Sequence, residues 1–580
     1  MAEDELMALT ETRPAETGSD SADVAALPSF TPDGFLGSVD HKPIGRMFVG
    51  GGIIFLLAGL VVGLVAAFES SDGSTFQIAA DGAEFAQIWS ISRDLAIFGG
   101  LVPILIGIGL YIVPLQIGAP SLAFARGASG AFWTWLLGTG LLIVAYLLNG
   151  GPGGGRRDFV VLWACSLAMM IGAAVWALVV LASTVLGART VGMTMDRMPF
   201  TSWAYFMFSL HAIFSLPIVM GELLLVLLRV RYGHLDITDT ASLTGVLDGV
   251  SLAPSIYWLG LPALGIAADV IGAHTGLPIL QRRITMVAIT AFELLAFGQD
   301  LVGMATERAV EFDNVLLVVG LLTAPLPVLA VLGLGGNSLR QGTLRLKAAL
   351  AAVLLSGLLL LAATVASLLG LVEPVMGYLE ELSPGSVDMT NSLVLNGTTF
   401  HEGIRGLVMA AALLAVIGAL HHWAPKIWGR TLAEPMGMLS ALLAAAGGLV
   451  WAVGEIGAGF ADQPWYPVSV DTTGGQQAFG VIALIGIALL AASAALLAGN
   501  VVSATAGRKP AGTSAVDWSG TTLEWATASP PPLGNFPAPP IVTSATPLAD
   551  GELAYDGLTS ESEDGGSSEE SSEGEAGGES

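Results

Sequence analysis

Apolar segments of membrane-spanning length recur along almost the whole chain and limit what it can fold into. A helix needs about 20 apolar residues to cross a hydrocarbon core of about 30 Å. Segments of this kind alternate here with short stretches rich in Gly, Pro and charge. Only 12% of the 580 residues are charged, about half of the roughly 25% found in soluble proteins. The pattern predicts an all-α integral membrane protein, a bundle of twelve transmembrane helices. The predicted spans are 46–68, 91–115, 131–149, 158–186, 201–230, 250–273, 284–304, 314–334, 347–370, 405–424, 437–460 and 476–500.

Acidic residues are concentrated in the two tails. Residues 1–45 hold nine and residues 511–580 hold 13 of the 48 acidic residues, so the net charge of −26 says little about the membrane part. We predict four regions from this distribution. They are an acidic cytoplasmic N-terminal tail over 1–45, the twelve-helix membrane domain over 46–500, a cytoplasmic extension over 501–556 and an acidic disordered tail over 557–580.

The distribution of Lys and Arg predicts the orientation of the bundle. With twelve spans both termini lie on one side, and that side carries fifteen of the 22 Lys and Arg residues, against seven on the opposite side. Positive charge accumulates in cytoplasmic loops. We therefore expect a multi-pass protein of the cell membrane with both termini in the cytoplasm. Its first partner is the lipid bilayer, and the sequence contains no phosphate-binding loop and no basic patch typical of a nucleic-acid partner.

Several short motifs stand at helix ends and in one segment after the last span. They are Val113-Pro114-Leu115-Gln116-Ile117-Gly118-Ala119-Pro120, Gly192-Met193-Thr194-Met195-Asp196-Arg197-Met198-Pro199-Phe200, Ser215-Leu216-Pro217, Trp423-Ala424-Pro425-Lys426, and Thr522-Leu523-Glu524-Trp525 with Ser529-Pro530-Pro531-Pro532 and Asn535-Phe536. In this order the motifs resemble the haem-copper oxidase subunit I family over about residues 38–550, chiefly its proton-pumping cytochrome c and quinol oxidase branch. The resemblance implies the same twelve-helix fold, an aerobic respiratory membrane, other respiratory oxidase subunits as partners, and a segment Thr522–Phe536 that packs along the cytoplasmic face.

The histidines that this family uses are missing from the corresponding places. The resemblance implies two haems and a copper held by six histidines on the second, sixth, seventh and tenth helices. The chain has seven histidines, which are His41, His211, His234, His274, His401, His421 and His422. Counting along the motifs, the ligand positions are occupied by Ser92 or Arg93, by Ala253 with Tyr257 retained four residues later, by residues close to Gln299 and Asp300, and by Gly403 and Arg405.

Groups that support the cofactors in this family are also replaced. Asp462-Gln463-Pro464-Trp465 stands where the family has paired arginines for the haem propionates, and the predicted span 314–334 lacks the lysine of one proton path. Loss of the ligands together with their supporting groups predicts that the haem and copper sites are degenerate, so that no cofactor and no metal is bound.

Charged residues inside apolar segments are costly and are therefore candidates for function. The carboxylates of this kind are Glu222, Asp269, Glu293, Asp300 and Glu455. We also expect Arg93 and Arg405 to fill the empty haem pocket and to pair with acids there. The alternative is that the two arginines extend to the membrane surface. His211, at mid-membrane depth, is either a hydrogen-bonded core residue or a ligand.

Three functions are compatible with these residues. The preferred one is a non-catalytic homologue of the oxidase subunit, acting as a membrane subunit or assembly partner. In the second, the chain is an active oxidase-like haem protein whose ligands are displaced to His211 or His401. In the third, the same scaffold transports protons or ions along Glu222, Asp269 and Glu293.

Overall fold

The structure is a computed structural model that describes most of the membrane part and one C-terminal segment. The described residues are 40–71, 78–152, 154–233, 257–277, 279, 281–305, 319–320, 322–372, 395, 397–464, 474–506, 520–549 and 553–555. The predicted tail over 557–580 and nearly all of the predicted tail over 1–45 lie outside them.

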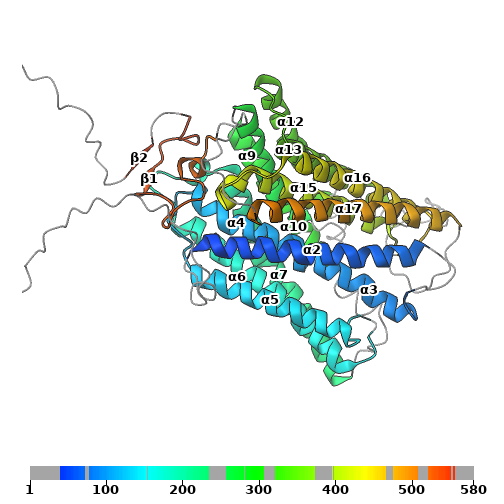
Figure 1. Ribbon diagram of the computed structural model, residues 1–580. Coiled ribbons are helices and arrows are strands. Elements are labelled where there is room, and N and C mark those ends of the chain that lie inside the picture. The colour runs from blue at the N-terminus through cyan, green and yellow to red at the C-terminus, as the bar shows by residue number, and fades with distance from the viewer. Residues whose placement is uncertain are drawn as a thin grey trace, which may run out of the picture.

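The described residues form a bundle of long helices (Figure 1). Its elements are α2 (His41–Ser71), α3 (Gly82–Asp94), the π-helix η1 (Leu95–Leu101), α4 (Val102–Gln116), α5 (Ala125–Leu147), α6 (Arg157–Gly187), η2 (Met195–Arg197), α7 (Phe200–Tyr232), η3 (Tyr257–Leu259), α9 (Gly260–Thr275), α10 (Arg282–Ala305), α12 (Pro325–Gln341), α13 (Ala348–Ala366), η5 (Ser367–Leu371), α15 (Phe400–Trp428), α16 (Glu434–Phe460), α17 (Gly474–Ala506), η7 (Leu523–Ala526), and the short antiparallel strands β1 (Pro540–Ile541) and β2 (Ala554–Tyr555).

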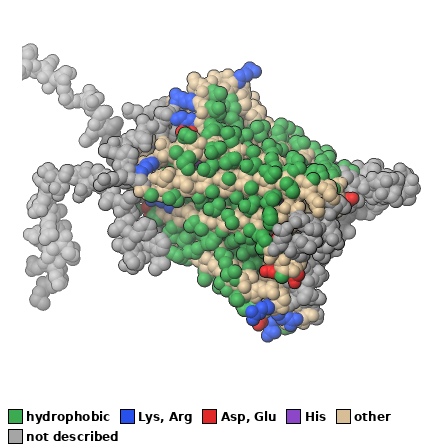
Figure 2. Space-filling model, turned by 45° about the vertical axis from the view of Figure 1, so that its right-hand side comes forward, with side chains coloured by type: hydrophobic (Ala, Val, Ile, Leu, Met, Phe, Trp, Pro, Cys, Tyr) green, Lys and Arg blue, Asp and Glu red, His purple; other side chains and the backbone are tan. Residues whose placement is uncertain are grey.

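The prediction of an all-α membrane bundle is confirmed. Each of the twelve predicted spans overlaps a described helix, and nine helical segments of the described residues are long and apolar enough to cross a membrane. The spans predicted over 250–273 and 314–334 correspond to α9 and α12, which have 16 and 17 described residues. Apolar side chains cover the middle of the visible face, and most of its charged side chains lie toward the two ends (Figure 2).

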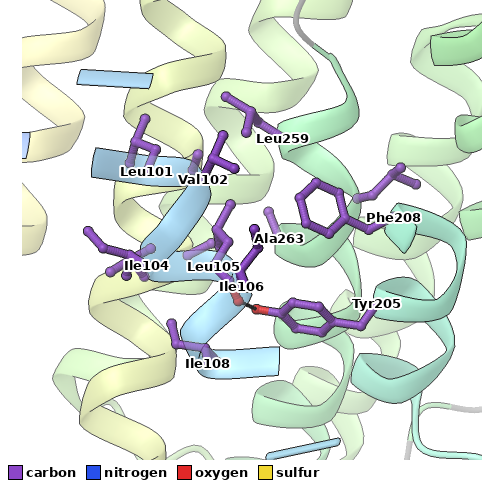
Figure 3. Packing of buried hydrophobic residues seen from close by; sticks show 14 of the residues in the cluster. Leu101, Val102, Ile104, Leu105, Ile106, Ile108, Tyr205, Phe208, Leu259 and Ala263 are labelled. Atoms are coloured by element: carbon purple, nitrogen blue, oxygen red, sulfur yellow. Dashed lines mark hydrogen bonds between the residues drawn. The ribbon is translucent and has the colours of Figure 1, made fainter. Parts of the chain in front are cut away.

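Two helical segments run through the centre of the bundle. The most apolar stretches of Gly82–Gln116 and of α15 are completely buried, whereas those of the other seven candidate spans are between 33% and 67% buried. Central aliphatic side chains of α4 meet Tyr205 and Phe208 of α7 and Leu259 of η3 (Figure 3). The Tyr205 hydroxyl donates a hydrogen bond to the carbonyl oxygen of Leu105 at 2.8 Å. Burial of this apolar surface, together with close packing, fixes how α4 and α7 lie against each other.

Four helical segments begin five or more residues earlier than the sequence predicts, at His41, Gly82, Ala125 and Phe400 instead of 46, 91, 131 and 405. In α2 and α15 the first turns carry paired polar residues. The predicted start at 46 is at His41 in α2, where Lys42 forms an ion pair with Asp40 at 2.8 Å. The predicted start at 405 is at Phe400 in α15, which places Glu402 inside the helix. A pattern of apolar residues misses such turns, since it does not register that their polar side chains have partners, among them the distant Asn535 for Lys42 and Arg93 for Glu402.

Residues 520–549 pack on one end of the bundle, which we call the extension end; the opposite end is the far end (Figure 1). Asn535 is buried, accepts a hydrogen bond from the Lys42 ammonium group at 3.2 Å and donates one to the carbonyl oxygen of Ala119 at 2.7 Å. The backbone N–H of Val542 donates to the carbonyl oxygen of Val191 at 3.0 Å. These contacts tie the segment to the ends of several helices.

Candidate functional site

A small cavity lies near the far end between α2, α3, α15, α16 and α17. Its volume is about 100 Å³. Aliphatic and aromatic side chains form most of its wall, and four charged side chains enter it. These charged residues are Arg93, Glu402, Arg405 and Glu455. Three of them were selected from the sequence; Glu402 was not.

The charged side chains form a compact cluster around one carboxylate. A single oxygen of Glu402, Oε1, accepts a hydrogen bond from Arg93 Nη2 and another from Arg405 Nη1, each at 2.6 Å. The side chains of Arg93, Glu402 and Arg405 are 11%, 7% and 2% exposed. Arg405 is thus enclosed in the protein and does not extend to the membrane surface. Both arginines that the sequence places near the haem ligand positions are paired with the same acid.

Neighbouring side chains hold this cluster in place. The guanidinium carbon of Arg93 lies 3.8 Å from the centre of the Trp89 ring, a cation–π contact. Trp451 donates from Nε1 to Glu455 Oε1 at 3.2 Å. Tryptophan side chains thereby hold Arg93 and Glu455 in place on two sides of the cavity.

The local sequence explains why these residues meet. Glu402 and Arg405 are three residues apart, so they lie on the same face of α15. Arg93 is the last but one residue of α3, immediately before the π-helix η1. A π-helical turn shifts the direction of the residues around it and is common near functional sites. The Ser92 hydroxyl donates to the carbonyl oxygen of Trp89 at 2.7 Å.

Gly403, another expected ligand position, sits at a close crossing of α15 and α16. A Cβ atom built on Gly403 would lie 2.6 Å from Ile456 Cγ1 and 3.0 Å from the carbonyl oxygen of Ala452. Small residues allow membrane helices to approach each other in this way. No side chain fits at this position without separating the two helices.

The residues of the cavity do not fit a haem held by two histidines. A guanidinium group is only a donor and has no lone pair with which to coordinate iron. Pockets that hold organic ligands have volumes of about 300–1,000 Å³, several times that of this cavity. The nearest histidine in sequence, His401, packs edge-on against Phe400 with ring centres 5.4 Å apart.

The expected copper-site residues are only partly within the described chain. Ala253 lies outside it, and so do the side chains of Gln299 and Asp300. Tyr257 is buried and donates from its hydroxyl to Ser367 Oγ at 2.9 Å. Within the described residues, no three side chains of His, Cys, Asp or Glu converge in a way that could hold a metal ion.

The carboxylates expected to form a relay are far apart. Glu293 of α10 lies 3.2 Å from His211 Nδ1 on α7, and the His211 ring stacks on Trp258 with centres 5.9 Å apart. Asp269 instead accepts hydrogen bonds from the backbone N–H groups of Phe200 and Thr201, at 3.1 and 2.8 Å, and so caps the start of α7. Glu222 is 21 residues beyond Thr201 on the same helix, about 31 Å along its axis. The structure brings His211 and Glu293 together but separates Asp269 from Glu222.

A second polar network joins the sequence motifs at the extension end. Gln116 donates to Glu524 Oε1 at 3.0 Å and accepts from the Ser202 hydroxyl at 2.7 Å. Trp423 donates to the same Glu524 oxygen at 3.2 Å. Burial raises the pKa of the Glu524 carboxyl above its ordinary value, although the hydrogen bond from Gln116 opposes the change. The motif residues therefore bind one another where the extension docks on the bundle.

Comparisons with known proteins match most of the chain to respiratory oxidases. The family described as Cytochrome C and Quinol oxidase polypeptide I matches residues 43–490. Cytochrome c oxidase subunit 1 of Bacillus sp. (strain PS3) is 25% identical over 537 residues, which cover 88% of this chain and 82% of that protein. The putative cytochrome c oxidase subunit 1-beta of Streptomyces avermitilis is 26% identical over 568 residues, 92% of this chain and 95% of that protein.

The fold is shared with a solved structure. A chain of a heme-copper terminal oxidase dimer, determined by cryo-electron microscopy, superposes with a TM-score of 0.60 at 14% identity and covers 85% of this chain and 89% of its own length. At 14% identity, this match shows a shared arrangement of the helices.

Proposed function

The chain belongs to the family of cytochrome c and quinol oxidase polypeptide I, and from this premise we propose that it has exchanged low-spin haem binding for an internal ion cluster. In this proposal the protein is a non-catalytic subunit or assembly partner in an aerobic respiratory membrane. The observation that carries the proposal is the pairing of Arg93 and Arg405 with one oxygen of Glu402.

The ion cluster would replace a structural role of the haem. In a family member with haem, the porphyrin and its two ligands join the second and tenth helices. Here Arg93 is on α3 and Arg405 on α15, the corresponding helices, and Glu402 joins them. Buried ion pairs contribute little net stability, but removal of one partner is costly because a buried charge remains. The cluster therefore fixes the relative position of the two helices without a cofactor.

Preserved contacts at the extension end support a role in an assembly. Gln116, Trp423 and Glu524 belong to motifs shared with the family, and all three meet in one buried network. This network joins the extension to the bundle, a structural role that requires no catalysis. One relative, from Aeropyrum pernix, is a heme-copper oxidase subunit I+III, so the same fold occurs in that family joined to another subunit. Other oxidase subunits are accordingly the proposed partners.

Co-isolation from native membranes tests the proposed partners. The tagged chain, solubilised in a mild detergent from its own organism, is expected to carry other oxidase subunits in a fixed molar ratio. A multi-span protein of unrelated function with the same tag serves as the control and should carry none of them. Isolation of the chain as a single species without oxidase subunits would contradict the role in assembly.

A further inference from the structure

A wide pocket at the extension end contains three arginines and has no role in the proposed function. It lies between η2, the start of α10 and residue Ala545 of the extension, and its volume is about 410 Å³. The charged residues in its wall are Asp196, Arg197, Arg282 and Arg283. Three cations and one anion line the pocket, and the nearby Asp269 carboxylate also interacts electrostatically with Arg282, so at least one positive charge is in excess. We propose that this pocket binds the phosphate of an anionic phospholipid.

Two of the arginines are held in position before any ligand binds. Arg197 Nη1 donates to the carbonyl oxygens of Gly192 and Val542, at 2.9 and 3.1 Å. Arg282 Nε donates to the carbonyl oxygen of Asp196 at 2.8 Å, and its guanidinium carbon lies 4.8 Å from the centre of the Phe200 ring. Such fixed cations lose little conformational entropy when they bind an anion.

One donor of this cluster needs a partner. Arg282 Nη2 is a buried atom without a hydrogen bond to any described residue. A buried donor that stays unsatisfied is destabilising. Phosphate oxygens suit guanidinium donors because two parallel N–H groups can bind them at once. A phosphate at this place would satisfy Arg282 and neutralise the excess charge.

The single acid of the pocket is turned toward its own loop. The Thr194 hydroxyl donates to Asp196 Oδ1 at 2.6 Å and lowers the pKa of this carboxyl, so Asp196 is anionic at neutral pH. It reduces the positive charge of the pocket without occupying Arg282 Nη2. Its removal is therefore expected to strengthen anion binding.

The apolar surface beside the pocket identifies the anion as a lipid. Ile284 is part of the pocket wall and is 50% exposed. Val287 and Leu294 follow it along α10 and are each 66% exposed. With spacings of three and seven residues they form one outward stripe. A phosphate seated on the arginines would place an acyl chain along this stripe, whereas free phosphate would use only the arginines.

Thermal unfolding of the purified full chain in a neutral detergent tests the proposal. Phosphatidylglycerol is expected to raise the midpoint temperature, while phosphatidylcholine and inorganic phosphate at equal concentration leave it nearly unchanged. Arg283→Gln should weaken the apparent affinity for phosphatidylglycerol about tenfold, which corresponds to about 1.4 kcal/mol, because it removes one charge-assisted hydrogen bond. Asp196→Asn should strengthen it.

The variants are chosen so that folding does not obscure the result. Arg283 is exposed, so its replacement by Gln is expected to leave the fold intact. Arg345 is an exposed arginine outside the pocket, and Arg345→Gln is the matched control. Equal lipid responses of Arg283→Gln and Arg345→Gln would overturn the proposal. An equal rise with phosphatidylcholine would overturn it too, and a full rise with inorganic phosphate would reject a lipid in favour of a free anion.

Discussion

Replacing Glu402 by Gln is expected to lower the free energy of unfolding by about 3–5 kcal/mol, the usual cost of removing one partner from a buried ion pair. The carboxylate is the direct partner of both Arg93 and Arg405, each at 2.6 Å. Its neutralisation leaves two guanidinium groups in a largely apolar cavity in which Glu455 is the remaining acidic residue. The measurement is the yield of monodisperse protein and its midpoint of thermal unfolding in detergent.

A double variant distinguishes the effect of the unbalanced buried charge from an effect of Glu402→Gln on packing. Glu402→Gln combined with Arg405→Met removes one acid and one base, so it should be more stable than Glu402→Gln alone. Asp158→Asn, an exposed acid in the first turn of α6, is the control and should change stability by less than about 1 kcal/mol. If Glu402→Gln unfolds at the temperature of the unaltered protein, the ion cluster does not hold α3 and α15 together.

Asp269→Ala is expected to lower the free energy of unfolding by about 2–4 kcal/mol, because the carboxylate accepts hydrogen bonds from two backbone N–H groups at the buried start of α7. Asp269→Asn keeps one acceptor oxygen and should cost less, about 1 kcal/mol. The pair of variants distinguishes a helix cap from a proton carrier. Thermal unfolding of both proteins provides the comparison, and equal losses of stability would contradict the capping role.

The spans could be predicted from the sequence because length and apolarity alone decide whether a helix can cross a membrane. The ends of the helices could not be predicted in the same way. The first turns of α2 and α15 contain Lys42 and Glu402, which interrupt the apolar pattern. These side chains are accommodated by Asp40 and by the two arginines of the cavity. A pattern of local hydropathy has no access to such partners.

Part of the ion cluster could also be predicted. Arg93 and Arg405 were identified because they stand near ligand positions of the family, but their common partner Glu402 was missed. The spacing of three residues between Glu402 and Arg405 was an available signal. This spacing is informative only if α15 is known to begin before residue 405. Asp269 was selected as a possible relay residue because it is a charged group in an apolar segment, although its two contacts with backbone N–H groups are those of a cap.

Sequence motifs, but not composition, predict that the extension packs on the bundle. Its abundant Pro, Ser and Thr would be typical of a linker. Glu524 and Asn535, however, are each 1% exposed and hydrogen-bonded to the ends of distant helices. Only the resemblance at Thr522–Phe536 predicted a packed segment.

In our proposal, an ion cluster stands here in place of the residues that bind haem in this family. The most direct test is a reduced-minus-oxidised absorption spectrum of the purified protein, together with a pyridine haemochrome assay and copper analysis. We expect no haem bands and less than about one tenth of a haem or copper per chain. One haem per chain, lost in His401→Ala or His211→Ala but not in the control His41→Ala, would contradict the account and show that the ligands have been displaced rather than lost.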